Sequence, residues 1–525
     1  MANKGTSGKS QNTSQENEDN QSKLIFELLN ELRLVNTENY VGVQLSISGN
    51  NELIPIDDER IINYTVHELY DRYKIWAKTS TIKSCISYMK YEGYLQEKVE
   101  LKHRIANDGD SIIYDLCDGN CVVVNKDGWN IRENDYMFFR HSVDQAPQVK
   151  PIRCENGWER LKKYLNIPDN DKILFIAYIV ACFNPQYTFP SLCINGASGS
   201  GKSTMTKLIK NIIDPSFSDV DIMTNSFDDL KVRLDSCYYA AFDNLSRISN
   251  SMSDFLCTVI TGGTYTTRKK YENNTPFIIR LKHGMCLNGI GNFVVNGDLV
   301  DRVLFMNTKP FQGAGIGDSV IKSEFQNDLP YIMGGIFDLL SKAINLFPTA
   351  KIENPIRLVD FHKFGYSIAE AMGGYGEEFN QALNRNRERQ LEIVDENFEI
   401  LRILVDFLIE NDGEWSSTVE MLWKSLKNFV ELDDEGKYNP KAIPKAANSF
   451  SKLLNLHEAD LAKRGFRFDK KKNGEGAKVL TFHTDRIIRK PITGIRKPII
   501  FEVDKIKLRA RIMESYIGES DNDNG

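Results

Sequence analysis

Eight residues near the middle of the 525-residue chain constrain its fold more than any others. They read Gly-Ala-Ser-Gly-Ser-Gly-Lys-Ser at 196–203 and complete the pattern G-x-x-x-x-G-K-S. A short apolar run of strand type, 190–195, precedes them, and apolar residues at helical spacing, 204–213, follow. A strand, a glycine loop and a helix in this order predict an α/β unit with an anion-binding loop at the carboxyl end of the strand.

The loop predicts a nucleoside triphosphate as ligand. Its glycines let backbone N–H groups turn towards phosphates, and the helix N-terminus adds the positive end of its dipole. We expect Lys202 to reach the β- and γ-phosphates and the Ser203 hydroxyl to bind Mg²⁺. The alternative is a glycine-rich turn without a ligand. The expected ATP contacts are Gly196, Ala197, Ser198, Gly199, Ser200, Gly201, Lys202, Ser203 and Thr204.

The composition argues against a disulfide-rich, a secreted or a membrane-spanning protein. The length predicts two to four domains, and 41% hydrophobic with 26% charged residues is typical of a soluble globular protein. Nine scattered cysteines predict reduced thiols; Cys117 and Cys121 are the closest pair, and we expect no histidine near enough to complete a metal site. The N-terminus lacks an apolar signal core, and the longest apolar run, 173–183, is too short to span a bilayer. We therefore expect a cytoplasmic protein without a membrane partner.

Shifts in composition and periodicity divide the chain into six segments. The first two are a polar tail that we expect to be disordered and an N-terminal α+β domain, mostly helical to about residue 105 and then a small β-meander. Alternating strand and helix patterns then predict a parallel ATPase core. The expected boundaries are 1–22 for the tail, 23–150 for the N-terminal domain, 151–350 for the core, 351–394 for a helical lid, 395–485 for a winged helix and 486–525 for a basic extension.

Polar residues at the ends of further predicted strands belong near the loop. The apolar run 237–242 leads into Asp243, where a carboxylate is placed to hold Mg²⁺, although a surface Asp-Asn turn would have the same sequence. A second apolar strand ends at the amide of Asn288. Arg302 precedes a third strand, 303–306, and it either pairs with a nearby aspartate or points into a neighbouring subunit.

The segment before the Asn288 strand predicts a β-hairpin. Residues 262–282 alternate on both sides of a polar turn. Basic residues next to aromatic ones suit an element that tracks a nucleic-acid strand, and a solvated charged hairpin is the alternative. These are Arg268, Lys269 and Lys270 beside Tyr265 and Tyr271.

The order of these elements resembles the helicases of superfamily 3 and the MCM group, which share an AAA+ core and a hairpin before the sensor strand. It is more similar to ATP-binding replication proteins of phages, integrative elements and chromosomal islands, including the self-loading helicases of staphylococcal mobile elements. The resemblance covers roughly residues 110–370 and is looser through the winged helix. The segments that carry it are Phe189–Thr204, Ala241–Ser246, Thr261–Gly263 with Thr267–Lys269, Leu287–Gly289 and Asp298–Arg302.

The resemblance implies a hexameric ring that encircles DNA and translocates along it by hydrolysing ATP. It implies that Asn288 senses the γ-phosphate and that Arg302 acts in the neighbouring subunit's site. One residue departs from the wider AAA+ pattern, because Asn244 stands where a glutamate general base follows the metal aspartate. An amide cannot accept a proton as a carboxylate does, so Asp243 or Asp254 takes that role, or hydrolysis is slow.

The C-terminal part predicts a second contact with DNA. Between residues 463 and 511, sixteen Lys or Arg stand against five Asp or Glu, in a chain of net charge −6. On the expected wing, Lys470, Lys471 and Lys472 would contact phosphates, which gives affinity without sequence choice. Winged helices also dock proteins, and the stretch 486–511 fits either a channel-side extension or a solvated tail.

These observations together predict an ATP-driven DNA helicase or translocase of a mobile-element replication module. Two other functions stay open. The first is a nucleotide-switched initiator or regulator that assembles on an origin without unwinding it. The second is an ATPase of a defence or signalling system, whose turnover would be indifferent to forked DNA.

Overall fold

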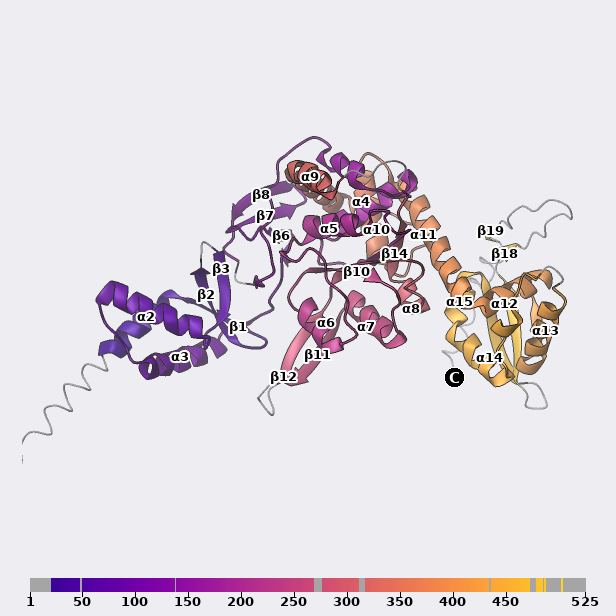
Figure 1. Cartoon of the computed structure of the whole chain (residues 1–525), viewed down its shortest axis with the longest axis horizontal. Helices are drawn as coiled ribbons and strands as arrows, with labels where there is room; N and C mark the ends of the chain where they lie inside the picture. Colours follow the sequence, from indigo (N-terminus) through magenta and orange to yellow (C-terminus); the bar gives the residue numbers. More distant parts are fainter. Residues whose placement is uncertain are drawn as a thin grey trace, which may run out of the picture. The chain divides into compact units, whose positions relative to one another are not determined.

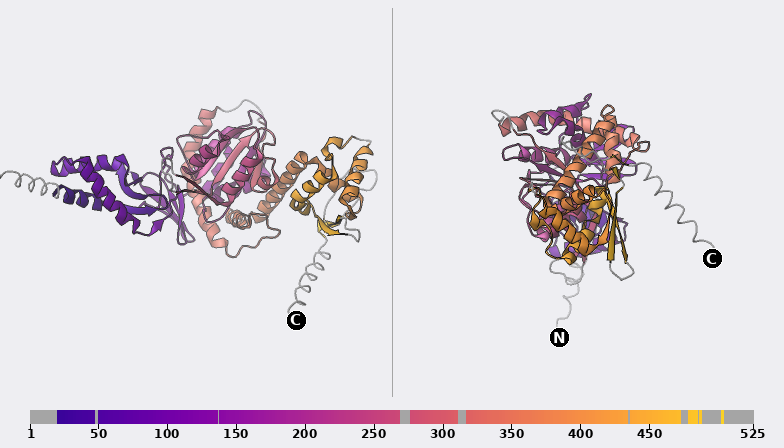
Figure 2. Two further views of the ribbon diagram at one scale, coloured as in Figure 1. Left: turned by 90° about the horizontal axis from the view of Figure 1, so that it is seen from below. Right: turned by 90° about the vertical axis from the view of Figure 1, so that its right-hand side faces the viewer.

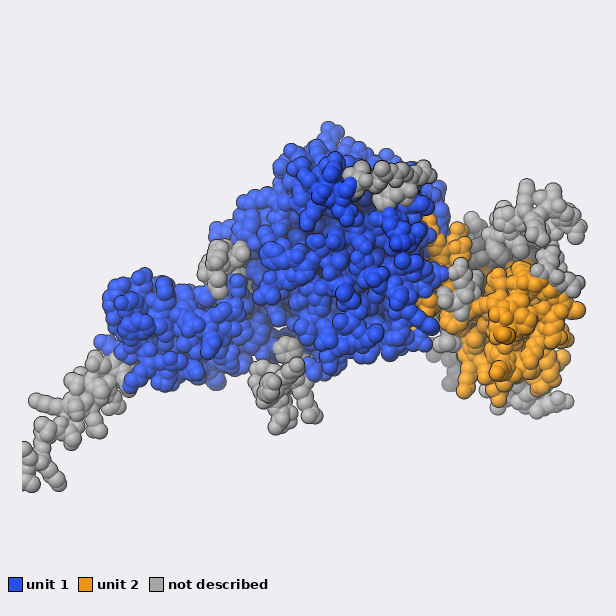
Figure 3. Space-filling model, in the orientation of Figure 1, with its two compact units in different colours: residues 1–294, 301–386 blue, residues 295–300, 387–525 orange. Residues whose placement is uncertain are grey.

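The computed structural model describes residues 20–47, 50–136, 138–268, 276–310, 317–433, 436–472, 478–484, 486–487 and 502–503. The chain forms two compact units (Figure 3). The first comprises residues 1–294 and 301–386, and the second comprises residues 295–300 and 387–525. Within the described ranges, no helix combines the length and the apolar character needed to cross a membrane.

The first unit begins with a helix at residues 20–31 and a small sheet of order β3-β2-β1-β4 (Figure 1). Ile25, Val43 and Ile61 are among the buried side chains that join these helices and strands. The expectation of a mostly helical segment to residue 105 is therefore wrong for residues 33–55, where the alternating sequence of β2 is the signal that was missed. The elements are β1 (Arg33–Thr37), β2 (Val41–Ile47), β3 (Asn50–Pro55), α2 (Glu59–Tyr73), α3 (Thr79–Tyr94) and β4 (Lys98–Val99).

The predicted β-meander is confirmed as a four-stranded antiparallel sheet in chain order. Its apolar face packs on the following core rather than on the N-terminal helices, because Tyr114 and Trp129 contact the ring of Phe337 in α9. The Trp129 indole also donates a hydrogen bond to Asp338 Oδ1 at 2.8 Å. The boundary expected at residue 150 thus falls inside a packed body. The elements are β5 (Ile105–Asp108), β6 (Ser111–Asp115), β7 (Asn120–Asn125), β8 (Gly128–Glu133) and α9 (Asp318–Leu346).

A fully parallel sheet of order β10-β13-β9-β14 forms the centre of the first unit, as predicted for an α/β fold. Strands β9, β13 and β14 are buried almost throughout, because helices enclose the sheet (Figure 2). Most of the apolar run at 173–183 lies in the buried helix α4. The strands are β9 (Ser191–Asn195), β10 (Tyr239–Leu245), β13 (Gly284–Gly289) and β14 (Val303–Asn307), and the helices are η1 (Gly157–Tyr164), η2 (Asp169–Asp171), α4 (Lys172–Ala181), α5 (Lys202–Ile213), α6 (Phe227–Leu234), α7 (Asn250–Thr261) and α10 (Val359–Ala371).

The predicted hairpin is confirmed between α7 and β13. Strand β11 (Gly263–Arg268) pairs antiparallel with β12 (Pro276–Leu281), from Gly263 opposite Leu281 to Arg268 opposite Pro276. The turn 269–275, with Lys269, Lys270 and Tyr271, lies outside the described residues.

The second unit holds helices and a three-stranded antiparallel sheet of order β15-β17-β16. Strands β16 and β17 flank the turn of the expected wing, and the short strand β15 pairs with β17. Most of the basic extension 486–525 lies outside the described residues, apart from a bridge between β18 and β19. The elements are α8 (Gly297–Val300), α11 (Gly376–Asn397, which begins in the first unit), α12 (Glu399–Glu410), β15 (Trp415–Thr418), α13 (Val419–Glu431), η3 (Pro440–Ala442), α14 (Ala447–Leu456), α15 (Glu458–Lys463), β16 (Phe466–Lys472), β17 (Lys478–Thr484), β18 (Arg486–Ile487) and β19 (Glu502–Val503).

Candidate functional site

The loop 196–203 connects the carboxyl end of β9 to the first turn of α5. Gly199 and Gly201 have φ angles of 74° and 79°, in the left-handed region that residues with a Cβ rarely adopt. The N–H groups in the first turn of a helix have no acceptor within the helix. No side chain caps the start of α5, so these donors remain available to a ligand. These donors and the helix dipole suit a phosphate group, which fits the predicted contacts at 196–204.

Two residues that sequence reasoning missed hold this loop in place. The Asn166 side chain donates hydrogen bonds to Ser200 O at 2.9 Å and to Lys309 O at 2.7 Å. At the end of β14, Thr308 Oγ1 lies 2.6 Å from Ser200 Oγ. A Cβ on Gly196 would stand 2.0 Å from this threonine oxygen, so only glycine fits there. No sequence signal marks Asn166 or Thr308, because both are distant from the loop in the chain.

The Lys202 ammonium lies within the curve of the loop. Its Nζ donates to Gly196 O at 3.0 Å and to Ala197 O at 2.8 Å, and the side chain is largely buried. A positive charge held against these carbonyls is adjacent to the free N–H groups of α5. Lys202 can therefore add charge to the same phosphate that those groups would bind.

Hydroxyl and carboxylate groups meet beside the start of α5. Ser203 Oγ donates to Asp243 Oδ1 at 3.1 Å, and Thr204 Oγ1 donates to Asp318 Oδ1 at 3.1 Å. Oxygen ligands of this kind suit Mg²⁺, which completes its shell with water and phosphate oxygens. The chemistry of Ser203 and Asp243 therefore fits the predicted metal pair, and Asp318 is a nearby carboxylate that the sequence did not indicate.

Asn288 lies in the strand between β10 and β9 and is buried. Its Nδ2 donates to Thr206 Oγ1 at 2.9 Å, and its Oδ1 accepts from the backbone N–H of Asn244 at 3.3 Å. Asn244 has a φ of 60°, where the pairing of β10 with β13 shifts register, and its side chain is exposed. The structure thus joins Asn244 to the site by its backbone and does not identify Asp243 or Asp254 as general base.

Arg302 lies at the opposite end of the sheet from the loop. Its backbone carbonyl accepts from Ser191 N at 2.9 Å, at the amino end of β9. Its side chain is 7% exposed, and Nη1 donates to Cys257 Sγ at 3.6 Å. Arg302 is therefore separated from the loop of its own chain and largely enclosed in the single chain.

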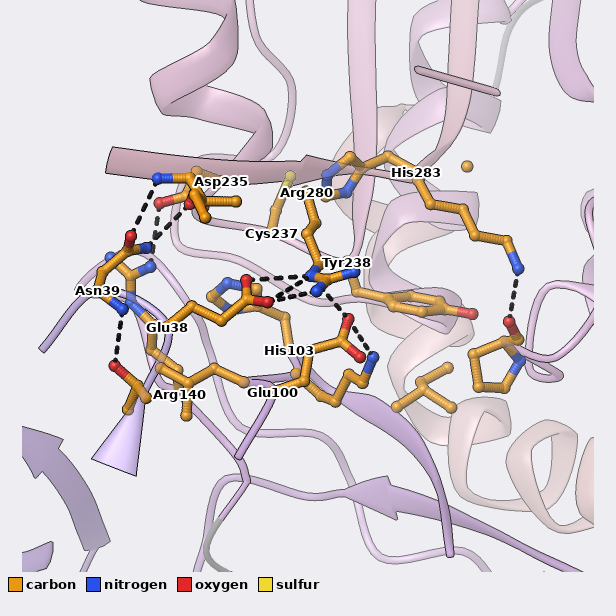
Figure 4. Close-up of a pocket in the computed structure, with 18 of the residues that line it drawn as sticks. Glu38, Asn39, Glu100, His103, Arg140, Asp235, Cys237, Tyr238, Arg280 and His283 are labelled. Carbon is orange, nitrogen blue, oxygen red and sulfur yellow. Dashed lines mark hydrogen bonds and ion pairs between the residues drawn. The ribbon is translucent and has the colours of Figure 1, made fainter. Parts of the chain in front are cut away.

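A cavity of about 210 Å³ lies at the base of the hairpin, beside the turn between β1 and β2 (Figure 4). The Asn39 side chain pairs with both backbone groups of Ile278 in β12: Nδ2 donates to Ile278 O at 2.9 Å, and Oδ1 accepts from Ile278 N at 3.0 Å. Arg280 Nε donates to Glu38 Oε2 at 3.0 Å. The N-terminal sheet is thus attached to one strand of the hairpin.

Charged groups and imidazoles line the same cavity. Burial, helped by the nearby Arg140 charge, lowers the pKa of His103 to about 4, and burial also lowers the pKa of His283. Arg140 pairs with Asp235 at 3.0 Å, and burial lowers the pKa of Lys282. Both imidazoles are consequently neutral at pH 7.

The predicted DNA contacts divide into described and undescribed parts. Arg268 ends the described part of β11, and Lys269 and Lys270 lie outside it. In the second unit, Lys471 is exposed on β16, and Lys470 Nζ lies 3.3 Å from Glu458 Oε2. Lys472 ends the same strand.

One expectation about the cysteines is wrong. Asp115, Cys117 and His141 place ligand atoms within 4.8 Å of one another, so a histidine does approach this cysteine. A hydrogen bond of 2.5 Å joins His141 Nε2 and Asp115 Oδ2. The buried Arg104 guanidinium donates to Cys117 Sγ at 3.1 Å and to Asp214 Oδ1 at 3.0 Å. A cation so close opposes a metal ion, and we interpret the cluster as a hydrogen-bonded network.

Two family models match this chain. Residues 160–378 match the actinomycete integrative conjugative element replication protein, and residues 401–491 match the AICE RepA C-terminal domain. These matches support a replication protein of a mobile genetic element. No curated protein is significantly similar in sequence.

Solved structures that match this chain include two apo structures of the A form of the NrS-1 C-terminal region. The first is 12% identical with a TM-score of 0.42, covering 88% of this chain and 99% of that chain. The second, of residues 305–718, is 14% identical with a TM-score of 0.37, covering 88% and 98%. Likenesses this low add nothing to the assignment of function.

Proposed function

We propose that the chain is an ATP-dependent DNA translocase or helicase that works as a hexameric ring in the replication of a mobile element. The observation that carries this proposal is the meeting of Lys202, Ser203 and Asp243 beside the uncapped start of α5. The two family matches support the replication context. The strand order with a hairpin before β13 fits an AAA+ core, and the elements of the second unit fit a winged helix that binds DNA.

In this proposal each residue has a defined role. The N–H groups of loop 196–203 and Lys202 bind the ATP phosphates, and Ser203 with Asp243 holds Mg²⁺, which neutralises charge on the transferred phosphoryl group. Asn288, oriented by Thr206, positions the attacking water. Arg302 contributes from the neighbouring subunit and would be released from its enclosed position when the ring assembles.

Strand β13 would transmit movement from the nucleotide site to the hairpin that binds DNA. Asn288 lies near the carboxyl end of this strand, and only two residues separate the end of β12 in the hairpin from the start of β13. A shift of β13 with nucleotide state would therefore move the hairpin that carries Arg268, Lys269 and Lys270. These cations would grip the phosphates of a strand in the ring channel.

Strand displacement tests the proposal. The full chain is incubated with ATP, Mg²⁺ and a forked DNA whose displaced strand is fluorescent, and is compared with Lys202→Ala. Lys150→Ala is the matched control, because Lys150 lies outside loop 196–203 and α5 and has an exposed ion pair to Asp118. We expect displacement by the wild type and the control, and a loss of about 100-fold or more in Lys202→Ala. No ATP-dependent displacement by the wild type would contradict a helicase.

A nucleotide-switched initiator is the second candidate, and Asn244 favours it. An exposed amide where a carboxylate base is expected suits slow hydrolysis and a long-lived ATP state. This candidate predicts ATP-dependent DNA protection without strand displacement, so the same forked substrate separates the two functions.

A further inference from the structure

Six aromatic side chains are exposed within a short stretch of the N-terminal part. The most exposed are Trp76 at 70% and Tyr91 at 62%. Elsewhere in the described residues, Phe217 and Phe227 are the other exposed aromatic side chains. Such clustering of large rings in water marks an interaction surface. This aromatic surface consists of Tyr70 and Tyr73 in the last turn of α2, Trp76 in the connection that follows, and Tyr88, Tyr91 and Tyr94 on α3.

Helix α3 separates its residues into two faces. Its apolar residues, such as Ile82 and Met89, are buried in the N-terminal core. Residues three apart on a helix are neighbours, with Cβ atoms about 5–6 Å apart, so Tyr88, Tyr91 and Tyr94 form a row of rings. The exposed positions before this row carry Ser80, Ser84 and Ser87 together with Lys83.

The charge of this region suits a polyanion. Helix α3 carries Lys83 and Lys90 and has its first acidic residue at Glu92. From Tyr70 to Lys98 the sequence holds six Lys or Arg against three Asp or Glu. Three of these cations are in ion pairs: Arg72 with Glu31 and Glu68, Lys74 with Asp71, and Lys90 with Asp57. The exposed Lys83 therefore supplies a positive charge on the same helix as the row of tyrosines, which suits a partner that carries phosphate groups.

Contacts between neighbours hold some of these rings. Trp76 contacts Tyr70 with ring centroids 5.0 Å apart, and the Lys74 ammonium lies 5.3 Å from the centre of Tyr70. Tyr88 meets Phe26 edge-to-face at 5.3 Å. A ring already held by a neighbour loses less entropy when a flat group stacks on it.

We propose that the aromatic surface binds single-stranded nucleic acid by stacking unpaired bases on its rings. Exposed rings with nearby lysines are the chemistry that binds single strands without sequence preference, whereas the bases of a duplex offer no free faces. The site goes beyond the proposed function, because it uses neither loop 196–203 nor the hairpin and does not require ATP.

Cross-linking locates the site in the full chain. Lys202→Ala protein, without nucleotide, is irradiated with a fluorescein-labelled 30-mer of thymidine, and the cross-linked peptides are identified by mass spectrometry. We expect cross-links within residues 70–98. Cross-links confined to other segments would overturn the proposal. The Lys202→Ala background keeps the result independent of ATP-driven translocation.

Affinity gives the second measurement, by fluorescence anisotropy with the same oligonucleotide. Tyr91→Ala/Tyr94→Ala should weaken binding about 10-fold or more, because both rings are exposed and neither makes a described ring contact. Phe217→Ala, an exposed ring outside the surface, is the matched control and should bind as the parent does. With an abasic 30-mer, the double variant and the parent should bind equally.

Two outcomes contradict the stacking proposal. Equal affinity of the double variant and the parent for the thymidine 30-mer would show that the rings do not contribute. A double variant that binds normally but loses self-association by analytical ultracentrifugation would assign the surface to a contact between copies of the chain. Unchanged thermal unfolding of the double variant confirms that the fold is intact.

Discussion

The attachment of Asn39 to the hairpin predicts a local change in the stability of β12. Its amide makes both hydrogen bonds to the backbone of Ile278. Each such bond contributes about 0.5–1.5 kcal/mol, so Asn39→Ala removes about 2 kcal/mol. The neighbouring Glu38–Arg280 pair is partly exposed, with side chains 24% and 53% accessible, and adds at most about 1 kcal/mol.

Hydrogen exchange of segment 276–281 in the full chain, without nucleotide, measures this effect. A loss of about 2 kcal/mol corresponds to about 30-fold faster exchange of the Ile278 amide in Asn39→Ala. Glu38→Gln should accelerate the same amide less than about fivefold. Unchanged protection of Ile278 in Asn39→Ala, in a protein with unaltered thermal unfolding, would refute the attachment of the hairpin to the N-terminal sheet.

Two further predictions concern buried charge. Arg104→Leu leaves the buried Asp214 carboxylate without one of its two cationic partners and should cost about 3–5 kcal/mol in urea unfolding, against less than about 0.5 kcal/mol for the exposed pair in Lys207→Ala. The pKa of His103 is lowered to about 4 in the folded chain, so as the pH falls the imidazole becomes protonated in the unfolded chain before it does in the folded chain. Stability from His103 is therefore fully present above about pH 6.5 and falls by up to about 1.4 kcal/mol per pH unit towards pH 4. The unfolding free energy of His103→Asn, followed between pH 7 and 5, should lose that part of the slope; an identical slope would contradict a buried neutral imidazole.

Local sequence signals predicted the parts of the molecule that short segments determine. The loop 196–203, its flanking strand and helix, the meander and the hairpin each have their pattern within a few consecutive residues. The parallel sheet followed from the alternation of such segments. The meeting of Ser203 and Asp243 was predictable, because the carboxyl ends of parallel strands lie at one edge.

Contacts between distant segments could not be predicted in the same way. Asn39 and Ile278 are 239 residues apart, and nothing near either residue indicates the other. Arg104 is fully buried because five acceptors from separate segments surround it, and no pattern near it in the sequence indicates them. The contact of the meander with the core could not be predicted for the same reason, since the partner of Trp129 lies in α9.

The most direct test of the central claim is the ATPase rate of the full chain with and without forked DNA. The wild type and Arg268→Ala/Lys269→Ala are compared at saturating ATP and Mg²⁺. The account predicts strong stimulation by DNA in the wild type and its loss in the variant, while basal turnover survives. Turnover that ignores DNA in both proteins would contradict a translocase whose hairpin grips the strand.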